Sequence, residues 1–272
     1  PLVLLVLLGL PLVYQSTPTE VLKLKTFDAL IPEQNPSGYF TVLNITEDDI
    51  NREGGYPLPR QRLAEINAQL KKKGALGIGW VVAYPQPDRF GGDETFKQSL
   101  ADIPSVLAMF EGDNAQYPNT TGTVILGEDV GGIPAAGVIQ NIDLFKETSQ
   151  QGIAVARTEV DSLVRRLPLL LRTPDGWVPA YGTEVLKILV GADTYVIKTN
   201  DNGLEEIRVK GLPSVPVDSL GRKWISFVNT PHTDLVEMDV KDKFVFIGFT
   251  AKGIMPQLAT PVGLLEPHMI QA

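Results

Sequence analysis

The side chains best suited to chemistry lie close together in the first quarter of the chain. Thr46-Glu47-Asp48-Asp49 follows a β-branched and aromatic run, Tyr39–Ile45, at a strand end where α/β proteins often bind ligands. Carboxylates grouped in this way can hold a divalent cation, which prefers oxygen donors, or can form a solvated loop before a helix. Arg60 follows Pro59 at an expected helix start, where it would pair with a carboxylate of that loop or bind an anionic ligand.

The sequence offers little for covalent catalysis. Cysteine is absent, which excludes disulfides, thiolate metal sites and cysteine nucleophiles. Only two histidines occur, His232 and His268, and no nucleophile elbow or Ser-His-Asp pattern accompanies them. The glycine-rich residues 127–137 lack both the Lys-Ser/Thr of a phosphate loop and the spacing of a dinucleotide fingerprint, so we predict a loop there. We therefore predict no catalytic residue, no metal site and no cofactor.

Composition and charge narrow the class of partner. The chain has 272 residues, is 43% hydrophobic and 21% charged, and carries a formal net charge of −8. An acidic surface argues against nucleic acid or anionic lipid as a partner. The chain is long enough for one large domain with a sizeable core.

An uncharged run of Leu and Val, Pro1 to Val13, opens the chain. It is shorter than the ~20 apolar residues that cross a bilayer. It can be the end of a transmembrane anchor, the remnant of a secretory signal or a buried core helix, and we favour the anchor for residues 1–15. No second long apolar run follows, so we expect residues 16–272 to form one domain on one side of the membrane.

The elements that must position these residues can be read from hydrophobic spacing. Apolar residues at Leu63, Ile66 and Leu70 predict an amphipathic helix from Arg60 that stops at Gly74. Strands are expected before it, at residues 39–45, and after it, at residues 75–84, which together make a βαβ unit. A helix at residues 93–103 and a strand at 105–110 follow.

The second half of the chain reads as hairpins and one more buried strand. Asn202-Gly203 between two alternating runs predicts a hairpin, and a second hairpin is expected around residues 219–221. Residues 180–190, which Gly191 ends, and residues 266–272 are expected to be helical, and residues 243–249 are expected to form a buried strand. Arg165 and Arg166 lie in a β-like run, where they would point to opposite faces and could not share one pocket. We predict a single α/β domain with a mixed sheet.

Four blocks of sequence carry a family resemblance. They are residues 44–60, which end in Pro57-Leu58-Pro59-Arg60, and residues 74–96, 159–169 and 242–272. Together, and in this order behind an apolar leader, they resemble the CHASE2 domain, the extracytoplasmic sensory module of bacterial cyclases, histidine kinases, diguanylate cyclases and serine/threonine kinases. The resemblance extends from about Phe27 to Ala272.

The chain departs from the family pattern at several positions. Thr46, Val81 and Pro256 stand where an Asp is usual, Gln271 where a His is usual, and Ser162 where a Gly is common. Without those acids a hard-cation site would lose most of its Coulomb attraction, so no metal site is carried over. The family positions that remain imply a ligand site built from Arg60, Tyr84, Asp161, Arg165, Thr250 and Thr260, with His268 close by.

The resemblance implies a sensor anchored in the cell membrane, with its globular part outside the cytoplasm. It would pass a small-molecule signal to a cyclase- or kinase-type output domain by binding one of two states more tightly, and would act as a homodimer. Two alternatives stay open. One is an extracytoplasmic hydrolase, which requires a Ser or Thr hydroxyl near a histidine that is backed by a carboxylate. The other is a domain that binds no small ligand and mediates dimer contacts.

Overall fold

The computed structural model describes residues 17–31, 34–113, 116–118 and 122–272. The predicted anchor at residues 1–15 lies outside the described residues. Within the described part of the chain, no helix combines the length and apolar character needed to cross a bilayer.

A seven-stranded sheet organises the larger part of the molecule. Its strands run in the order β15-β1-β16-β2-β3-β6, and β7 also pairs with β3. All pairings are parallel except that of β3 with β6, so the predicted mixed sheet is confirmed. The strands are β1 (Phe40–Ile45), β2 (Gly77–Trp80), β3 (Ser105–Glu111), β6 (Val138–Ile139), β7 (Gln150–Ile153), β15 (His232–Thr233) and β16 (Phe244–Phe249). The expected strands β1 and β2 are parallel, but β16 lies between them.

Helices cover both faces of this sheet. Successive side chains of a strand point to opposite faces, so Val245 and Ile247 of β16 pack with one layer, and Phe244 and Phe246 with the other. The first layer contains α3 (Glu47–Arg52), α4 (Arg60–Lys72), α5 (Asp93–Ala101) and α6 (Asp143–Lys146). The second layer contains α7 (Tyr181–Leu189) and α8 (Pro267–Gln271). The predicted helices at Arg60 and at residues 93–103, 180–190 and 266–272 are thus confirmed, each within a few residues at its ends.

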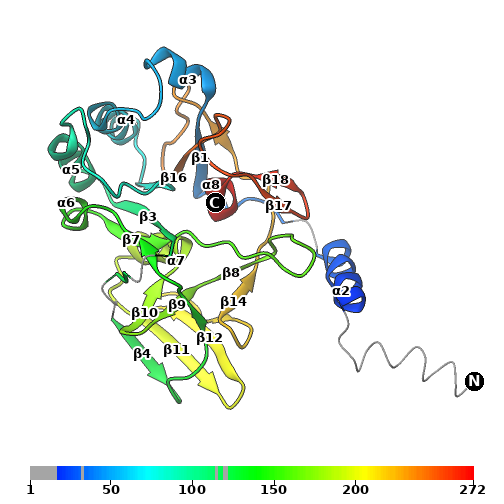
Figure 1. Ribbon diagram of the computed structural model, residues 1–272. Coiled ribbons are helices and arrows are strands. Elements are labelled where there is room, and N and C mark those ends of the chain that lie inside the picture. The colour runs from blue at the N-terminus through cyan, green and yellow to red at the C-terminus, as the bar shows by residue number, and fades with distance from the viewer. Residues whose placement is uncertain (1–16, 32–33, 114–115, 119–121) are drawn as a thin grey trace, which may run out of the picture.

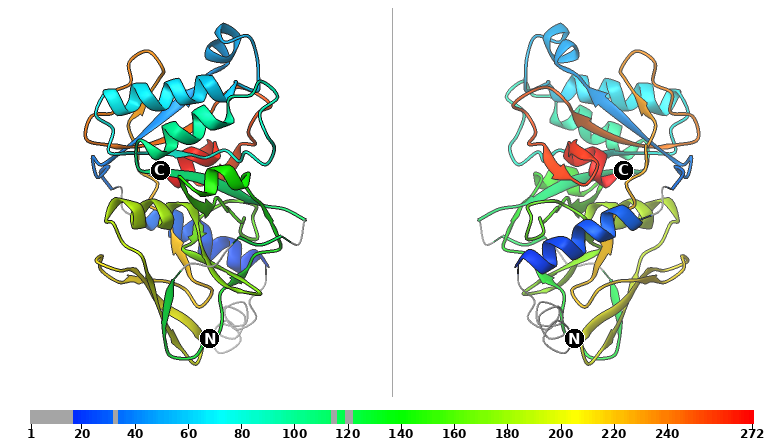
Figure 2. Two further views of the ribbon diagram at one scale, coloured as in Figure 1. Left: turned by 90° about the vertical axis from the view of Figure 1, so that its left-hand side faces the viewer. Right: turned by 90° about the vertical axis from the view of Figure 1, so that its right-hand side faces the viewer.

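Smaller sheets extend the molecule away from the main sheet (Figure 2). Their strands are β4 (Thr123–Leu126), β5 (Ile133–Pro134), β8 (Arg166–Pro168), β9 (Leu170–Thr173), β10 (Gly176–Pro179), β11 (Tyr195–Asn200), β12 (Gly203–Val209), β13 (Val215–Pro216), β14 (Arg222–Trp224), β17 (Leu258–Thr260) and β18 (Gly263–Leu265). The predicted β11–β12 hairpin is confirmed. The predicted second hairpin is wrong: a turn does form near Ser219, but β13 pairs with β12 and β14 pairs with β8. Local turn signals gave no information on these distant partners.

Helix α2 (Thr17–Leu30) stands apart from these layers and lies across one side of the molecule (Figures 1 and 2). Only Leu24 of this helix is buried. Leu22 and Leu30, on the face that points away from the body, are 66% and 74% exposed. The helix therefore has few contacts with the rest of the chain, and those contacts decide where it lies.

Candidate functional site

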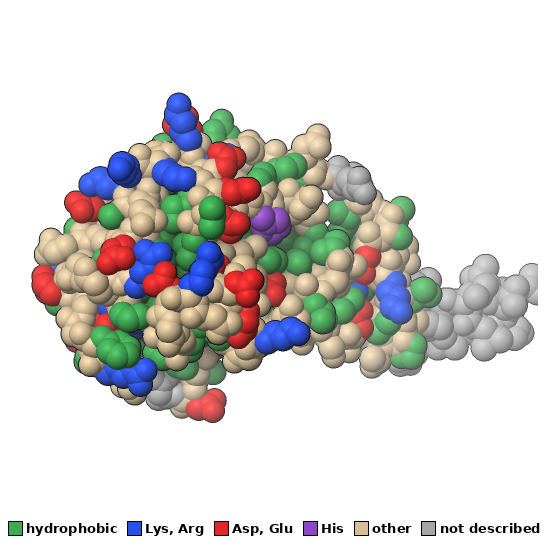
Figure 3. All heavy atoms as spheres, turned by 90° about the horizontal axis from the view of Figure 1, so that it is seen from above, with side chains coloured by type: hydrophobic (Ala, Val, Ile, Leu, Met, Phe, Trp, Pro, Cys, Tyr) green, Lys and Arg blue, Asp and Glu red, His purple; other side chains and the backbone are tan. Residues whose placement is uncertain are grey.

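Two cavities lie beside each other between helix α2, helix α8 and the β17–β18 hairpin. The first, the α8 cavity, has a volume of about 310 Å³ and is bounded by residues 225–230, His232 and α8. The second, the α2 cavity, has a volume of about 430 Å³ and is bounded by the end of α2, Arg165 and Trp224. Both are lined by Ile225, Ser226, Phe227 and Val262. Seen from above, the surface is hollowed beside a histidine, and hydrophobic side chains line the hollow (Figure 3).

Arg165 holds two carboxylates at the α2 cavity. Its Nη1 and Nη2 donate to the two oxygens of Asp161 over 2.7 and 2.8 Å, and its Nε and Nη2 donate to Asp28 of α2 over 2.7 and 2.8 Å. Arg165 is 1% exposed. The hydrogen bonds from Arg165 lower the pKa of the Asp161 carboxyl, and those from Asp161 and Asp28 raise the pKa of the guanidinium further above its usual value. We call these three residues the Arg165 clamp.

An aromatic contact adds to the clamp. The ring of Phe27 on α2 stacks on that of Trp224 at the end of β14, with centroids 4.8 Å apart and planes within 10°. The Arg166 guanidinium lies 5.1 Å from the Trp224 ring centroid and also pairs with Glu159 and Asp218. Arg165 and Arg166 therefore have separate partners, as expected if neighbouring side chains point apart. Helix α2 is held at one end by an ion pair and a ring stack.

Arg60 and Tyr84 meet at another place, beyond the carboxyl end of β2. The Arg60 guanidinium lies 4.1 Å from the centroid of the Tyr84 ring, and its Nε lies 3.5 Å from Asp93. The Arg60 backbone N–H donates to Asp88 over 2.9 Å. The expectation that Arg60 pairs with the Thr46–Asp49 loop is wrong, because its two acidic partners are Asp88 in the loop before α5 and Asp93, the first residue of α5. Burial raises the pKa of the Tyr84 phenol, whose oxygen has no hydrogen-bond partner in the described chain.

The Thr46–Asp49 stretch begins a helix. Thr46 caps α3 in a capping box with Asp49, whose carboxylate also pairs with Arg52. Among the described residues, no group of three or more His, Cys, Asp or Glu side chains is arranged to hold a metal ion. The capping interpretation of this stretch accounts for its sequence, because Thr, then Asp three residues later, satisfies the first backbone donors of a helix.

His268 is buried on α8 against the main sheet. Its Nε2 donates to Asn44 Oδ1 over 2.8 Å, and Asn44 Nδ2 lies 3.5 Å from His232 Nδ1. Its ring lies close to Gly248 of β16, where an added Cβ would come within 2.3 Å of the imidazole. Burial, with a smaller effect of His232, lowers the pKa of His268 to about 3. His268 is a neutral structural side chain in this position.

The two threonines of the predicted site make local contacts. The Thr250 backbone N–H donates to the Ile45 carbonyl at the end of β1 over 3.0 Å, and the Thr260 hydroxyl donates to Gly263 within the β17–β18 hairpin over 2.7 Å. The predicted residues thus fall into several groups and do not share one pocket. Among them only Arg165 lines either of the two cavities, with Asp161 bonded to it.

The sequence reasoning missed the residues that build the two cavities. Asp28 was not considered because it lies 137 positions from Arg165. Residues 225–232 have no periodicity and no charged side chain, so only their run of Ser, Asn, Thr and His could have drawn attention to them. Their position beside α8 follows from the pairing of β15 with the edge of β1.

Comparison with known protein families matches the CHASE2 domain over residues 2–272, and the chain belongs to this family. No curated protein and no solved structure matches the chain. CHASE2 domains are sensory modules of signalling receptors and lie outside the cytoplasm. The family resemblance inferred from the four sequence blocks is confirmed.

Proposed function

We propose that this chain is the extracytoplasmic sensory module of a membrane-bound bacterial receptor, and that it passes a small-molecule signal to a cytoplasmic output domain of cyclase or kinase type. The observation that carries the proposal is the extent of the family match, which begins at residue 2 and so includes the apolar run together with the globular part. In this arrangement residues 1–15 end a transmembrane anchor and α2 is the first element beyond it.

The attachment of α2 supports a signalling role for this helix. It follows the apolar run by a few residues and touches the body mainly through Leu24, the Phe27–Trp224 stack and the Arg165 clamp. These contacts border the α2 cavity, so a ligand that moves the side chains of the cavity wall also changes the contacts that hold α2. A receptor needs such an element, with two positions whose relative free energies a ligand can alter.

The hydrolase alternative requires a hydroxyl and a carboxylate beside a histidine. Within the described chain, the side-chain hydrogen bonds of both His268 and His232 are with Asn44. This geometry fits a structural role for the two imidazoles and gives the hydrolase hypothesis no site to start from. We therefore favour a sensor without chemistry of its own.

Single cysteines would test the topology, because the chain has no native cysteine. Asn202 lies exposed in the β11–β12 turn, whereas Ala108 of β3 is fully buried and serves as the matched control. We expect a membrane-impermeant maleimide to label Asn202→Cys of the full-length protein in intact bacterial spheroplasts, and to label Ala108→Cys only after denaturation. Labelling of Asn202→Cys only after lysis would contradict the proposal.

A further inference from the structure

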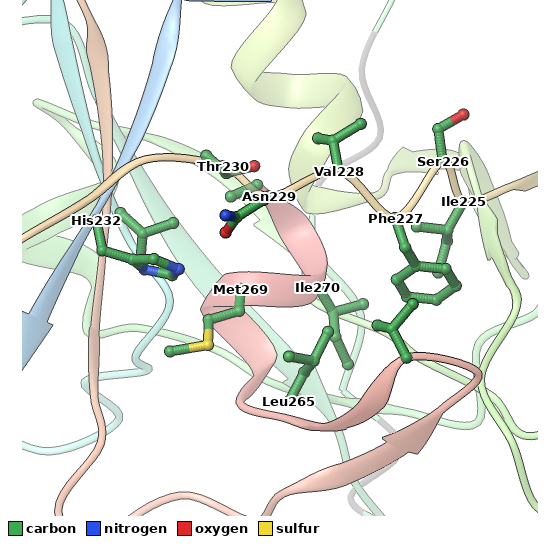
Figure 4. A pocket seen from close by; sticks show the side chains of 13 residues that line it. Ile225, Ser226, Phe227, Val228, Asn229, Thr230, His232, Leu265, Met269 and Ile270 are labelled. Carbon is green, nitrogen blue, oxygen red and sulfur yellow. The ribbon is translucent and has the colours of Figure 1, made fainter. Parts of the chain in front are cut away.

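The wall of the α8 cavity is mostly apolar and has no charged side chain. Apart from Ser226, Asn229, Thr230 and His232, its lining side chains are apolar, and none of them is an acid, lysine or arginine. Figure 4 shows Phe227 and Ile225 at one end and His232 at the other, with Met269 of α8 below the Asn229 amide. The cavity thus offers an apolar floor and a polar strip along one side.

Nδ1 of His232 in this polar strip lies 3.5 Å from Asn44 Nδ2, whereas the side chains of Ser226, Asn229 and Thr230 have no hydrogen bond with the described residues. Thr230 is 7% exposed, and its hydroxyl takes part in no hydrogen bond with the described residues. The side chains of Asn229 and Ser226 are exposed, so they can bond with water as well as with a ligand. The Thr230 hydroxyl is not among the fully enclosed unpaired polar atoms of the described chain, so it is accessible from the cavity that Thr230 lines and can hydrogen-bond with a group of a bound molecule.

We infer that the α8 cavity binds a neutral, largely apolar small molecule that carries a hydroxyl, carbonyl or amide group. The polar group would hydrogen-bond with Thr230 and Asn229, and the apolar part would lie against Phe227 and Met269. A charged ligand would lose its hydration on entering this cavity and would meet no side chain of opposite charge there, so its binding free energy would be unfavourable. The guanidinium of Arg165, which lines the neighbouring α2 cavity, already binds two carboxylates.

This inference names the ligand class of the proposed sensor and so takes its biological meaning from that proposal. Phe227 and Ile225 form a wall that the ligand cavity shares with the α2 cavity. Trp224, which precedes this wall in the chain, stacks on Phe27 of α2. A ligand that displaces Phe227 therefore changes the stacking of Trp224 on Phe27 of α2, because residues 224–227 form one short segment.

Three probes with one skeleton test the ligand class: 4-phenyl-1-butanol, 4-phenylbutyrate and 4-phenylbutylamine at neutral pH. The chain has four methionines, and Met269 lines the α8 cavity whereas Met109 lines another one. In the ¹³C-methyl-methionine NMR spectrum of the 272-residue chain in lipid nanodiscs, we expect the alcohol to shift the Met269 signal saturably. The signals of Met238 and Met255 serve as internal controls, and Met269→Leu assigns the resonance.

The charged probes should bind at least tenfold more weakly than the alcohol, and Thr230→Val should weaken alcohol binding about fivefold to tenfold, as expected for one lost hydrogen bond. Thr183→Val is the matched control, since Thr183 is also buried with an unpaired hydroxyl but lines a different cavity. A second variant, Leu265→Trp, fills the α8 cavity and should abolish the shift.

Several results would overturn the inference: equal binding of the three probes, a Met109 shift in place of a Met269 shift, no effect of Thr230→Val, or no saturable shift with the alcohol or with the smaller 2-phenylethanol. Hydrogen exchange of α2 with bound alcohol separates this failure from that of the proposed function. Binding without any change in α2 exchange would leave the cavity site intact and refute the signalling role of the helix.

Discussion

Replacing Arg165 with methionine should release α2 and destabilise the whole domain. The variant keeps a side chain of similar length but removes four hydrogen bonds of 2.7 to 2.8 Å and leaves Asp161 and Asp28 facing each other without a cation. Removing one partner of a buried pair costs about 3 to 5 kcal/mol. Asp161 and Asp28 are 11% and 19% exposed, so water can partly solvate them, and we expect about 3 kcal/mol.

For a domain of this size that loss corresponds to a decrease of about 6 to 12 °C in the melting temperature. The free energy of unfolding is measurable by urea titration with circular dichroism, and release of α2 by hydrogen exchange of residues 17–30. Arg157→Met is the matched control, because Arg157 also forms a bidentate pair, with Glu111, but is 41% exposed. Its loss should change the free energy of unfolding by about 1 kcal/mol or less.

The clamp also has a pH signature with a definite sign. The folded pKa of Asp161 lies below its unfolded value, so the clamp's stabilisation is fully present above the unfolded pKa of about 3.9 and is lost as pH falls through the folded pKa. Arg165→Met should lack this part of the acid destabilisation. The reasoning is refuted if Arg165→Met unfolds within 1 kcal/mol of the parent chain and α2 exchanges as slowly as before.

Three further predictions follow from single residues. Gly248→Ala should destabilise the chain by about 2 to 3 kcal/mol, since the new methyl group meets the His268 ring at 2.3 Å; thermal unfolding would show this, and a change below 0.5 kcal/mol would contradict it. The folded pKa of His268 is about 3, so between pH 6.5 and 3 the unfolded chain binds one proton more than the folded chain. The free energy of unfolding should therefore fall by up to about 1.4 kcal/mol for each pH unit of acidification in this range. The dependence on pH should be weaker in His268→Gln, and an unchanged dependence would count against a buried neutral imidazole. Ser162 has φ of 66°, so Ser162→Gly should stabilise the chain by about 0.5 to 1 kcal/mol in urea titration, and a loss of stability would refute the strain argument.

Patterns within about ten residues predicted the elements well. The Leu63–Ile66–Leu70 spacing marks α4, and the apolar run at β16 marks a strand buried on both faces. Such patterns did not predict which distant strands pair. β14 pairs with β8 and β15 pairs with β1, and no local sequence pattern indicates either partner. The position of Ser162 illustrates a partial success, because the family pattern places glycine where the backbone turns out to be left-handed.

The candidate site was the least predictable part, for a physical reason. Ionisable residues such as Arg60 and His268 attract attention in a sequence, yet here each is bound to protein partners, Asp93 and Tyr84 in one case and Asn44 in the other. Residues 225–230, which line the cavities, carry no charge, and the side chains of Thr230 and Asn229 have no hydrogen-bond partner in the described chain. Unpaired polar groups become visible only when the surrounding side chains are placed.

The contrast between α2 and the body explains how a small ligand could operate this domain. A 14-residue helix is marginal alone in water, so its order depends on Leu24, the ring stack and the Arg165 clamp. The main sheet, by comparison, has apolar layers on both faces, and no residue of α2 belongs to either layer. Local opening is easiest where buried contacts are fewest, so we expect α2 to open at a lower free energy than the strands of the main sheet. A ligand that binds one of two positions of α2 tenfold more tightly than the other changes the balance by about 1.4 kcal/mol, which is about half of what the clamp contributes, so it changes the populations of the two positions without overcoming the clamp.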